Sequence, residues 1–259
     1  MLQPLKVNVS QCGLPEGIGE NIQHSLSLGL PELQVGLLKH DGTFVLCASG
    51  PSIANHVDEI KQDQENGKTL CAVKGAYDFL RGHGITPDLY LSVEPRYKPV
   101  LDPSEETAFL LASRCHKQMF EDLKSFRVYL WHSWSIEDGT EHLMGKPLIG
   151  GGTTSGLRAV NVGYLLGFRK FKWYGMDSSL GEQGEKRVGQ DPLSDFVKQY
   201  EVIVGEENPT VYRTNAAMAA QANEAQVIYN VMPDISVSVI GEGLIPAIWK
   251  ERQKRGLHC

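Results

Sequence analysis

The chain has 259 residues, of which 41% are hydrophobic and 22% charged, and its formal net charge is −6. This length fits one α/β domain with additions, and charges of both signs argue against duplex nucleic acid or an anionic membrane as the main partner. No apolar run approaches the roughly 18 residues of a membrane span, and the first residues lack a signal-peptide layout. We therefore expect a cytoplasmic chain that acts on a small molecule. Its five scattered cysteines are expected to be reduced.

The first 40 residues are mixed in character. They contain the segment GIGENIQHSLSLGLPEL, which is typical of a short amphipathic helix that ends at a Gly-Leu-Pro break. We expect residues 1–40 to be a lead-in segment that packs against a main domain formed by residues 41–259.

From Thr43 onward, short apolar runs alternate with stretches of helical periodicity, as in buried parallel strands joined by helices. This alternation predicts an α/β fold: a Rossmann-like, doubly wound, mainly parallel sheet with helices on both faces. The expected strands are 44–48, 69–73, 89–93, 109–112, 128–131, 171–174 and 235–240.

Residues 178–214 interrupt this alternation, being polar and rich in Gly, Glu and Gln. We expect one helix near residues 193–204 and interpret the insertion as a lid, because insertions after a strand's carboxyl end often cover a ligand. The cations Lys186, Arg187 and Arg213 are candidates for holding an acidic substrate, although solvated charges are the ordinary alternative. A helix over residues 215–231 is expected to lead into the last strand.

Several common catalytic motifs are missing from the sequence. It contains no G-x-x-x-x-G-K-[ST] loop, no H-E-x-x-H, no G-x-S-x-G and no G-x-G-x-x-G after the first strand. The usual nucleotide triphosphatase, zinc hydrolase and dehydrogenase interpretations are therefore disfavoured.

The first candidate binding segment, Ala48-Ser-Gly-Pro-Ser52, follows the first central strand. Gly50 suits a helix cap and Pro51 the first helical position, so the amides of Ser52 and Ile53 are expected to be free at the positive end of a helix. That geometry attracts an anion. Ser49, Gly50 and Ser52 are therefore candidates for binding a nucleotide, and a well-capped helix without a ligand is an equal alternative.

The second candidate segment, Gly150-Gly-Gly-Thr-Thr-Ser-Gly156, precedes a predicted helix over residues 157–166. A cap alone would not require three glycines, each of which costs roughly 0.5–1 kcal/mol in chain entropy. Both segments belong to one sheet edge, where they can face a shared crevice that fits a nucleotide. The binding candidates in this segment are Gly151, Gly152, Thr154, Ser155 and Gly156.

Three further residues are candidates for catalysis. Glu94 ends the strand 89–93 and suits a metal or substrate ligand, or else a pair with Arg96. Asp177 follows the strand 171–174 and suits a base or metal ligand, or else a turn cap. His116 follows another strand and is a reserve proton carrier.

Short motifs occur in a fixed order along the chain: G-P-S at 50–52, K-G-A at 74–76, G-I-T-P-D at 84–88, S-V-E-P at 92–95, G-G-T-T-S-G at 151–156, L-G-F-R at 166–169 and G-M-D at 175–177. This ordered set resembles the MptE-like family, which includes archaeal 6-hydroxymethyl-7,8-dihydropterin diphosphokinases and a domain of motility accessory factors. The G-P-S and T-S-G elements also resemble bacterial sialyltransferases, which are Rossmann-like and bind a cytidine nucleotide sugar.

The chain departs from both groups. Ala48-Ser49 stands where the sialyltransferases have Gly-Asn, and His258 is the one histidine beyond Ser155, where they place a histidine base. The pterin kinases tend to have an aspartate-rich segment after the third strand, where this chain has Glu94.

The resemblance implies a transferase that uses a nucleotide or nucleotide sugar linked to CMP, UDP or GDP, with a small-molecule or glycan acceptor. Glycosyl transfer is the first hypothesis. A diphosphokinase using Mg²⁺ and ATP and a non-catalytic nucleotide-binding module are the alternatives, and the oligomeric state stays open.

Overall fold

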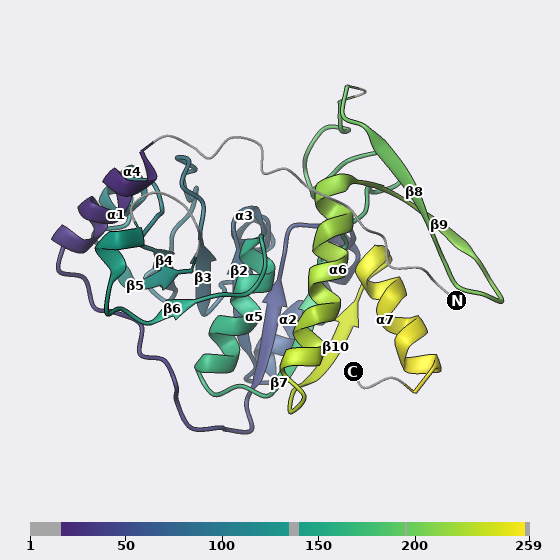
Figure 1. Cartoon of the computed structure of the whole chain (residues 1–259), viewed down its shortest axis with the longest axis horizontal. Helices are drawn as coiled ribbons and strands as arrows, with labels where there is room; N and C mark the ends of the chain where they lie inside the picture. The colour runs from purple at the N-terminus through teal and green to yellow at the C-terminus, as the bar shows by residue number, and fades with distance from the viewer. Residues whose placement is uncertain (1–16, 135–139, 195, 257–259) are drawn as a thin grey trace.

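The computed structural model describes residues 17–134, 140–194 and 196–256 (Figure 1). Its strands are β1 (Thr43–Cys47), β2 (Thr69–Val73), β3 (Leu89–Ser92), β4 (Ala108–Ala112), β5 (Arg127–Ser133), β6 (Leu148–Ile149), β7 (Lys170–Tyr174), β8 (Gln199–Val204), β9 (Thr210–Asn215) and β10 (Ser236–Ile240). Its α-helices are α1 (Ile18–Ser27), α2 (Val57–Glu65), α3 (Gly75–Gly82), α4 (Lys117–Asp122), α5 (Ser155–Leu165), α6 (Ala216–Val231) and α7 (Leu244–Lys254), and its 3₁₀ helices are η1 (Pro51–His56) and η2 (Thr140–Leu143).

The main sheet has eight parallel strands in the order β10-β7-β1-β2-β3-β4-β5-β6. From β1 the chain proceeds outward to β6, then returns to place β7 on the other side of β1. The strand order therefore reverses between β1 and β7. The carboxyl ends of strands at such a reversal are where open α/β sheets bind ligands.

Helices cover both faces of the sheet, as the alternating pattern predicts. Crossovers between parallel strands are right-handed, so the helices that lead into the strands on the β2 side of β1 lie on one face of the sheet. The helices that lead into β7 and β10, on the other side of β1, lie on the opposite face. Figure 1 shows α5 and α6 in front of the sheet, with α2 and α3 behind it. The predicted α/β class, with its mainly parallel sheet, is confirmed, and each of the seven predicted strands is a strand of this sheet.

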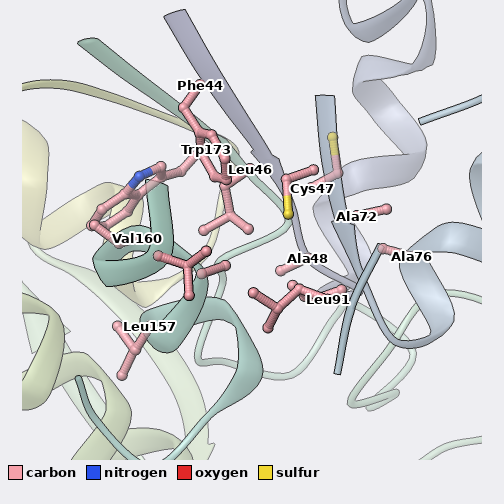
Figure 2. Close-up of a cluster of buried hydrophobic side chains, with 14 of the residues drawn as sticks. Phe44, Leu46, Cys47, Ala48, Ala72, Ala76, Leu91, Leu157, Val160 and Trp173 are labelled. Atoms are coloured by element: carbon pink, nitrogen blue, oxygen red, sulfur yellow. The ribbon is translucent and has the colours of Figure 1, made fainter. Parts of the chain in front are cut away.

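The central strands are buried on both faces, which explains their continuous apolar sequences. In Figure 2, Leu157 and Val160 of α5 pack near Phe44 and Leu46 of β1, with Trp173 of β7 beside them. Each such side chain contributes roughly 1.5–3 kcal/mol when fully buried. This packing fixes where α5 begins relative to the carboxyl ends of β1 and β7.

A charged cluster is buried between α2 and β7. Asp63 is 4% exposed. Its carboxylate accepts hydrogen bonds from Lys68 Nζ at 2.5 Å and Tyr174 Oη at 2.8 Å, and pairs with Lys172 Nζ at 2.9 Å. Burial alone would raise the pKa of Asp63, but these bonds outweigh it and hold the pKa below its usual value. The cluster joins α2 to β7, the strand that borders the reversal point.

Helix α1 is bonded to the segments that follow β3 and β4. Asn21 of α1 donates from Nδ2 to the carbonyls of Pro95 and Arg114, both at 3.3 Å. Farther along, Glu32 forms a parallel bridge with Leu130 of β5. Residues 17–33 are therefore part of the same folded unit as the sheet.

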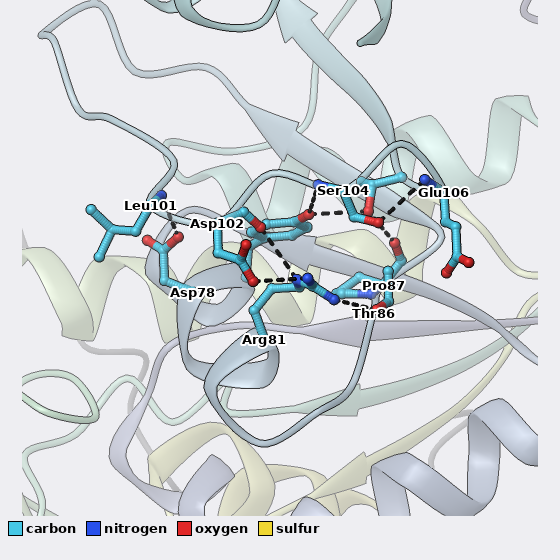
Figure 3. Close-up of polar contacts among 10 residues, drawn as sticks. Asp78, Arg81, Thr86, Pro87, Leu101, Asp102, Ser104 and Glu106 are labelled. Carbon is cyan, nitrogen blue, oxygen red and sulfur yellow. Dashed lines mark hydrogen bonds and ion pairs between the residues drawn. The ribbon is translucent and has the colours of Figure 1, made fainter.

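The connection from β3 to β4 is a loop held by polar contacts, which Figure 3 shows against α3. Asp78 accepts from the amide of Leu101 at 2.9 Å, and Arg81 pairs with Asp102 at 2.8 Å. Burial raises the pKa of Asp78. These contacts fix a loop that carries Lys98 toward the carboxyl end of β2.

The insertion at 178–214 differs from expectation in its secondary structure. The helix predicted near residues 193–204 is wrong, because Gln199–Val204 is strand β8, paired antiparallel with β9. The sequence Tyr200-Glu-Val-Ile-Val204 is rich in β-branched residues, which favour a strand. Figure 1 shows this hairpin projecting beyond the main sheet. The predicted helix over 215–231 is confirmed as α6, capped by Asn215.

Cys47, Cys71 and Cys115 are free and buried, as expected of reduced core thiols. Cys12, Cys259 and His258 lie outside the described residues. Among the described helices, none is both long enough and apolar enough to cross a membrane.

Candidate functional site

A cavity of about 230 Å³ lies at the reversal point of the strand order. Its walls come from the carboxyl ends of β1, β2 and β7, the beginning of α5, the insertion after β7, and α6. The lining residues are Ala48, Ser49, Gly50, Val73, Lys74, Thr153, Thr154, Ser155, Gly156, Gly175, Met176, Asp177, Ser178, Lys186, Arg187, Met218 and Gln221. The two predicted binding segments therefore share one cleft.

The beginning of α5 presents hydrogen-bond donors to this cleft. Thr154 caps the helix, and its Oγ1 accepts from the Leu157 amide at 3.3 Å. The amides of Ser155 and Gly156 have no acceptor within the described part of the chain. Ser155 is 3% exposed, yet its Oγ has no hydrogen-bond partner there. A buried hydroxyl and free amides at the positive end of an eleven-residue helix form a site for an anion.

The glycine turn before α5 shapes this site without lining it. Gly151 and Gly152 have φ of 115° and 80°, in the region that favours glycine. A β-carbon on Gly152 would lie 2.7 Å from Leu157 Cδ1. Buried Arg158 donates from Nε to the Gly152 carbonyl at 3.0 Å. The turn is thus a rigid lead into α5, and neither glycine is among the residues that line the cavity.

The first predicted segment is built differently from the expectation. The Ser52 amide is not free: it donates to Asp177 Oδ2 at 2.7 Å, and Ser52 Oγ donates to Asp177 Oδ1 at 2.5 Å. The Ile53 amide donates to the Gly50 carbonyl. The prediction of an open helix end at Ser52 is therefore wrong, because Asp177 already occupies it. Ser49 and Gly50 line the cleft, and Ser52 lies behind it.

Asp177 is 3% exposed and forms part of the cleft wall. Burial raises its pKa, opposed by the two hydrogen bonds from Ser52. Gly50 permits this arrangement, since a β-carbon there would lie 2.5 Å from Asp177 Oδ2. Both carboxylate oxygens are used within the protein, so Asp177 joins the ends of β1 and β7 across the reversal point.

Glu94 lies beside the cleft, bound to two cations. Its carboxylate bonds to Lys74 Nζ and to Arg96 Nε, both at 2.8 Å. Burial would raise its pKa, but these partners lower it to about 2. A carboxylate with so low a pKa is a weak base near neutral pH. The pairing with Arg96 that the sequence left open is present, and Glu94 positions the Lys74 ammonium group at the cleft.

Lys74 has an unusual backbone, with φ 50° and ψ −126°. Residues other than glycine adopt this conformation at a cost of roughly 1–3 kcal/mol. It follows β2 directly and begins α3. Ser178, at φ 51°, is a second such residue on the cleft wall. Strained residues cluster at functional sites, which supports the assignment of this cleft.

Two sequence candidates lie outside the cleft. His116 caps α4, where its Nδ1 accepts from the Gln118 amide at 3.1 Å. Arg213 donates to the carbonyls of Gly181 and Glu182 at 3.3 and 3.1 Å. The structure therefore does not bring His116 to the reaction site we assign, and Arg213 braces the insertion.

Sequence reasoning singled out the two cations Lys186 and Arg187, and both line the cleft. It did not single out Lys74, Met218 or Gln221 as binding residues. Lys74 follows a strand end in the same way as Glu94, so the strand-end rule could have found it. Met218 and Gln221 carry no such signal, because helix α6 reaches the cleft only through tertiary packing.

These features define a class of protein: an α/β chain with a parallel sheet and an anion-attracting cleft at the strand-order reversal. A family model described as "6-hydroxymethylpterin diphosphokinase MptE-like" matches residues 19–183. The chain belongs to this MptE-like family, as its motifs predict.

One solved structure has the same fold, that of MAf glycosyltransferase from Magnetospirillum magneticum AMB-1. The TM-score is 0.63 at 14% sequence identity, and the match covers 90% of this chain. This chain spans only 38% of the length of that protein. No curated protein matches the sequence significantly.

Proposed function

We propose that the chain is a transferase domain that binds a nucleotide or nucleotide sugar in this cleft, with glycosyl transfer to a small-molecule or glycan acceptor as its reaction. One observation carries the proposal: Ser155 and Gly156 line a cleft at the strand-order reversal, their amides are free, and the buried Ser155 hydroxyl has no hydrogen-bond partner in the described part of the chain. A phosphate would supply the missing acceptors. The fold shared with a glycosyltransferase favours this chemistry over other uses of the site.

Each wall has a distinct task in this proposal. The α5 amides and Ser155 hold a phosphate of the donor. The cations that line the cleft, Lys74, Lys186 and Arg187, offset charge that builds on the leaving nucleotide. Ser49 and Thr154 add hydroxyls near the same group. The Ser52–Asp177 contact fixes the cleft floor. The donor nucleotide is of the CMP, UDP or GDP type.

The description of the family model favours a second candidate, a diphosphokinase that uses ATP and Mg²⁺. Such enzymes hold Mg²⁺ through one or two carboxylates together with the substrate phosphates. Here Asp177 is bound by Ser52, and Glu94 by Lys74 and Arg96. In the described ranges no three His, Cys, Asp or Glu side chains gather as a metal site. Because Asp177 and Glu94 already have protein donors, they favour glycosyl transfer over a diphosphokinase with a protein-held Mg²⁺ ion.

Thermal unfolding with nucleotides tests the proposal. A nucleotide at about 100 times its Kd adds about 2.7 kcal/mol to the free energy of unfolding. We expect stabilisation by CMP, UDP or GDP in EDTA. Stabilisation by ATP only with Mg²⁺ would favour the diphosphokinase, and binding without turnover of any nucleotide sugar would favour a binding module. If no nucleotide stabilises the chain, the proposal is wrong.

Ser155→Ala tests the residue that carries the argument. Because the hydroxyl has no partner, its removal should change the free energy of unfolding by less than about 1 kcal/mol. Nucleotide affinity should fall about 10–160-fold, since a hydrogen bond to a charged group contributes about 1.5–3 kcal/mol. Ser125→Ala, at an exposed serine, is the matched control. Unchanged affinity in Ser155→Ala would exclude this site.

A further inference from the structure

A group of cations lies at the same cleft as the beginning of α5. Four cations from three segments gather there: Lys74 after β2, Lys98 from the β3–β4 loop, and Lys186 with Arg187 from the insertion. We call them the cationic wall. Lys74, Lys186 and Arg187 line the cavity. Lys98 Nζ lies 3.6 Å from the position of a β-carbon on Gly75, which places it beside Lys74.

The cationic wall has an excess of positive charge. Among described residues, no carboxylate forms an ion pair with Lys98, Lys186 or Arg187, although all three are half-buried. The carboxylates nearby already have protein donors: Glu94 is shared between Lys74 and Arg96, and Asp78, which attracts Lys98 without a direct ion pair, accepts from the Leu101 amide. Burial first, and then the neighbouring cations, lowers the pKa of both Lys98 and Lys186. Cations held together away from solvent without partners are stabilised by an anion.

We propose, resting on the function proposed above, that the cationic wall binds a second phosphate, so that the cleft takes a diphosphate group. The α5 site holds one phosphate and the cationic wall the other, across a cavity of about 230 Å³. That volume is below the roughly 300–1,000 Å³ of pockets that enclose whole ligands, which fits a diphosphate with the rest of the molecule extending outward. The donor class is therefore a nucleoside diphosphate sugar, in preference to a monophosphate-linked one.

In this proposal the side chains of the cationic wall neutralise the charge of the diphosphate. Arginine and lysine stabilise phosphate oxygens directly, by charge-assisted hydrogen bonds. The two carboxylates at this edge, Glu94 and Asp177, already have protein donors. Diphosphate binding should therefore persist when divalent cations are removed by EDTA.

Base-independent probes test the proposal: inorganic phosphate and pyrophosphate, titrated calorimetrically in EDTA at low salt. Wild type should bind pyrophosphate at least tenfold more tightly than phosphate. In the double variant Lys186→Ala, Arg187→Ala, the affinity for pyrophosphate should fall at least tenfold and the affinity for phosphate less than threefold. The exposed pair Lys61→Ala, Lys250→Ala is the matched charge control and should match wild type.

Any of three results would overturn the proposal. The double variant could lose affinity equally for phosphate and pyrophosphate, wild type could show no preference for pyrophosphate, or pyrophosphate binding could require Mg²⁺. Should the double variant unfold, Lys186→Met keeps the side-chain length and is scored in the same way. Nucleoside mono- and diphosphates are titrated in parallel. If pyrophosphate follows the expected pattern but no nucleotide binds, the transferase proposal fails while the diphosphate site remains. If nucleotides bind without preference for the diphosphate, only the second site fails.

Discussion

Replacing Lys74 by glycine and by alanine separates its backbone role from its charge. Both variants lose the ammonium group and its 2.8 Å bond to Glu94, so they differ only in the β-carbon. At φ 50° and ψ −126°, a residue with a β-carbon costs roughly 1–3 kcal/mol that glycine avoids. Glycine loses about 0.5–1 kcal/mol more chain entropy on folding. Lys74 also caps α3, a position where glycine is preferred to alanine.

The balance predicts that Lys74→Gly is more stable than Lys74→Ala by about 1–2 kcal/mol. For a chain of this size, that corresponds to a Tm about 2–8 °C higher. Calorimetric or fluorescence-monitored thermal unfolding measures the difference. The matched pair is Lys61→Gly and Lys61→Ala within α2, where alanine should be the more stable by up to about 1 kcal/mol.

The two Lys74 variants should bind pyrophosphate equally weakly, since neither has the ammonium group. If Lys74→Ala is as stable as Lys74→Gly, the backbone at position 74 is relaxed, and its strain no longer supports the assignment of this cleft. If the stability order is as expected but both variants bind like wild type, the strain is real and the lysine has no part in binding.

Two further predictions concern the scaffold of the cleft. The pKa of Asp63 is depressed on folding, so its stabilising contribution is present above the ordinary aspartate pKa of about 3.9 and is lost as pH falls toward the lower folded value. Asp63→Asn should therefore lower the free energy of unfolding at pH 7 by about 3–5 kcal/mol, because two lysines lose their carboxylate partner. It should also make the free energy of unfolding less dependent on pH below pH 4. Urea unfolding measures both effects. Gly50→Ala should cost more than about 2 kcal/mol, because the new carbon would lie 2.4 Å from a backbone oxygen. Gly82→Ala, at an α3 glycine with open space around it, should instead stabilise by about 0.4–1 kcal/mol, and equal effects of the two would contradict the packing described at the cleft floor.

The sequence determined the parallel sheet because local information specifies buried strands. Runs such as Phe44–Cys47 are apolar at successive positions, which only a strand covered on both faces requires. The glycine-rich turn before α5 could also be predicted from the sequence, since Thr154 is a strong helix cap and consecutive glycines permit positive φ. In contrast, residues 199–204 were misassigned, because a short half-exposed strand has little periodicity of its own.

Tertiary structure alone decided which of the candidate polar groups are free to meet a ligand. Ser52 and Ser155 lie in two similar strand-to-helix turns. Asp177 accepts hydrogen bonds from the amide and hydroxyl of Ser52, whereas the Ser155 hydroxyl has no partner in the described part of the chain. The gathering of Lys74, Lys98 and Lys186 is likewise invisible in sequence, because they come from three segments brought together by strand order. The sequence determines which polar and charged groups each residue carries. The packing of distant segments determines which of these groups find a partner within the protein and which do not.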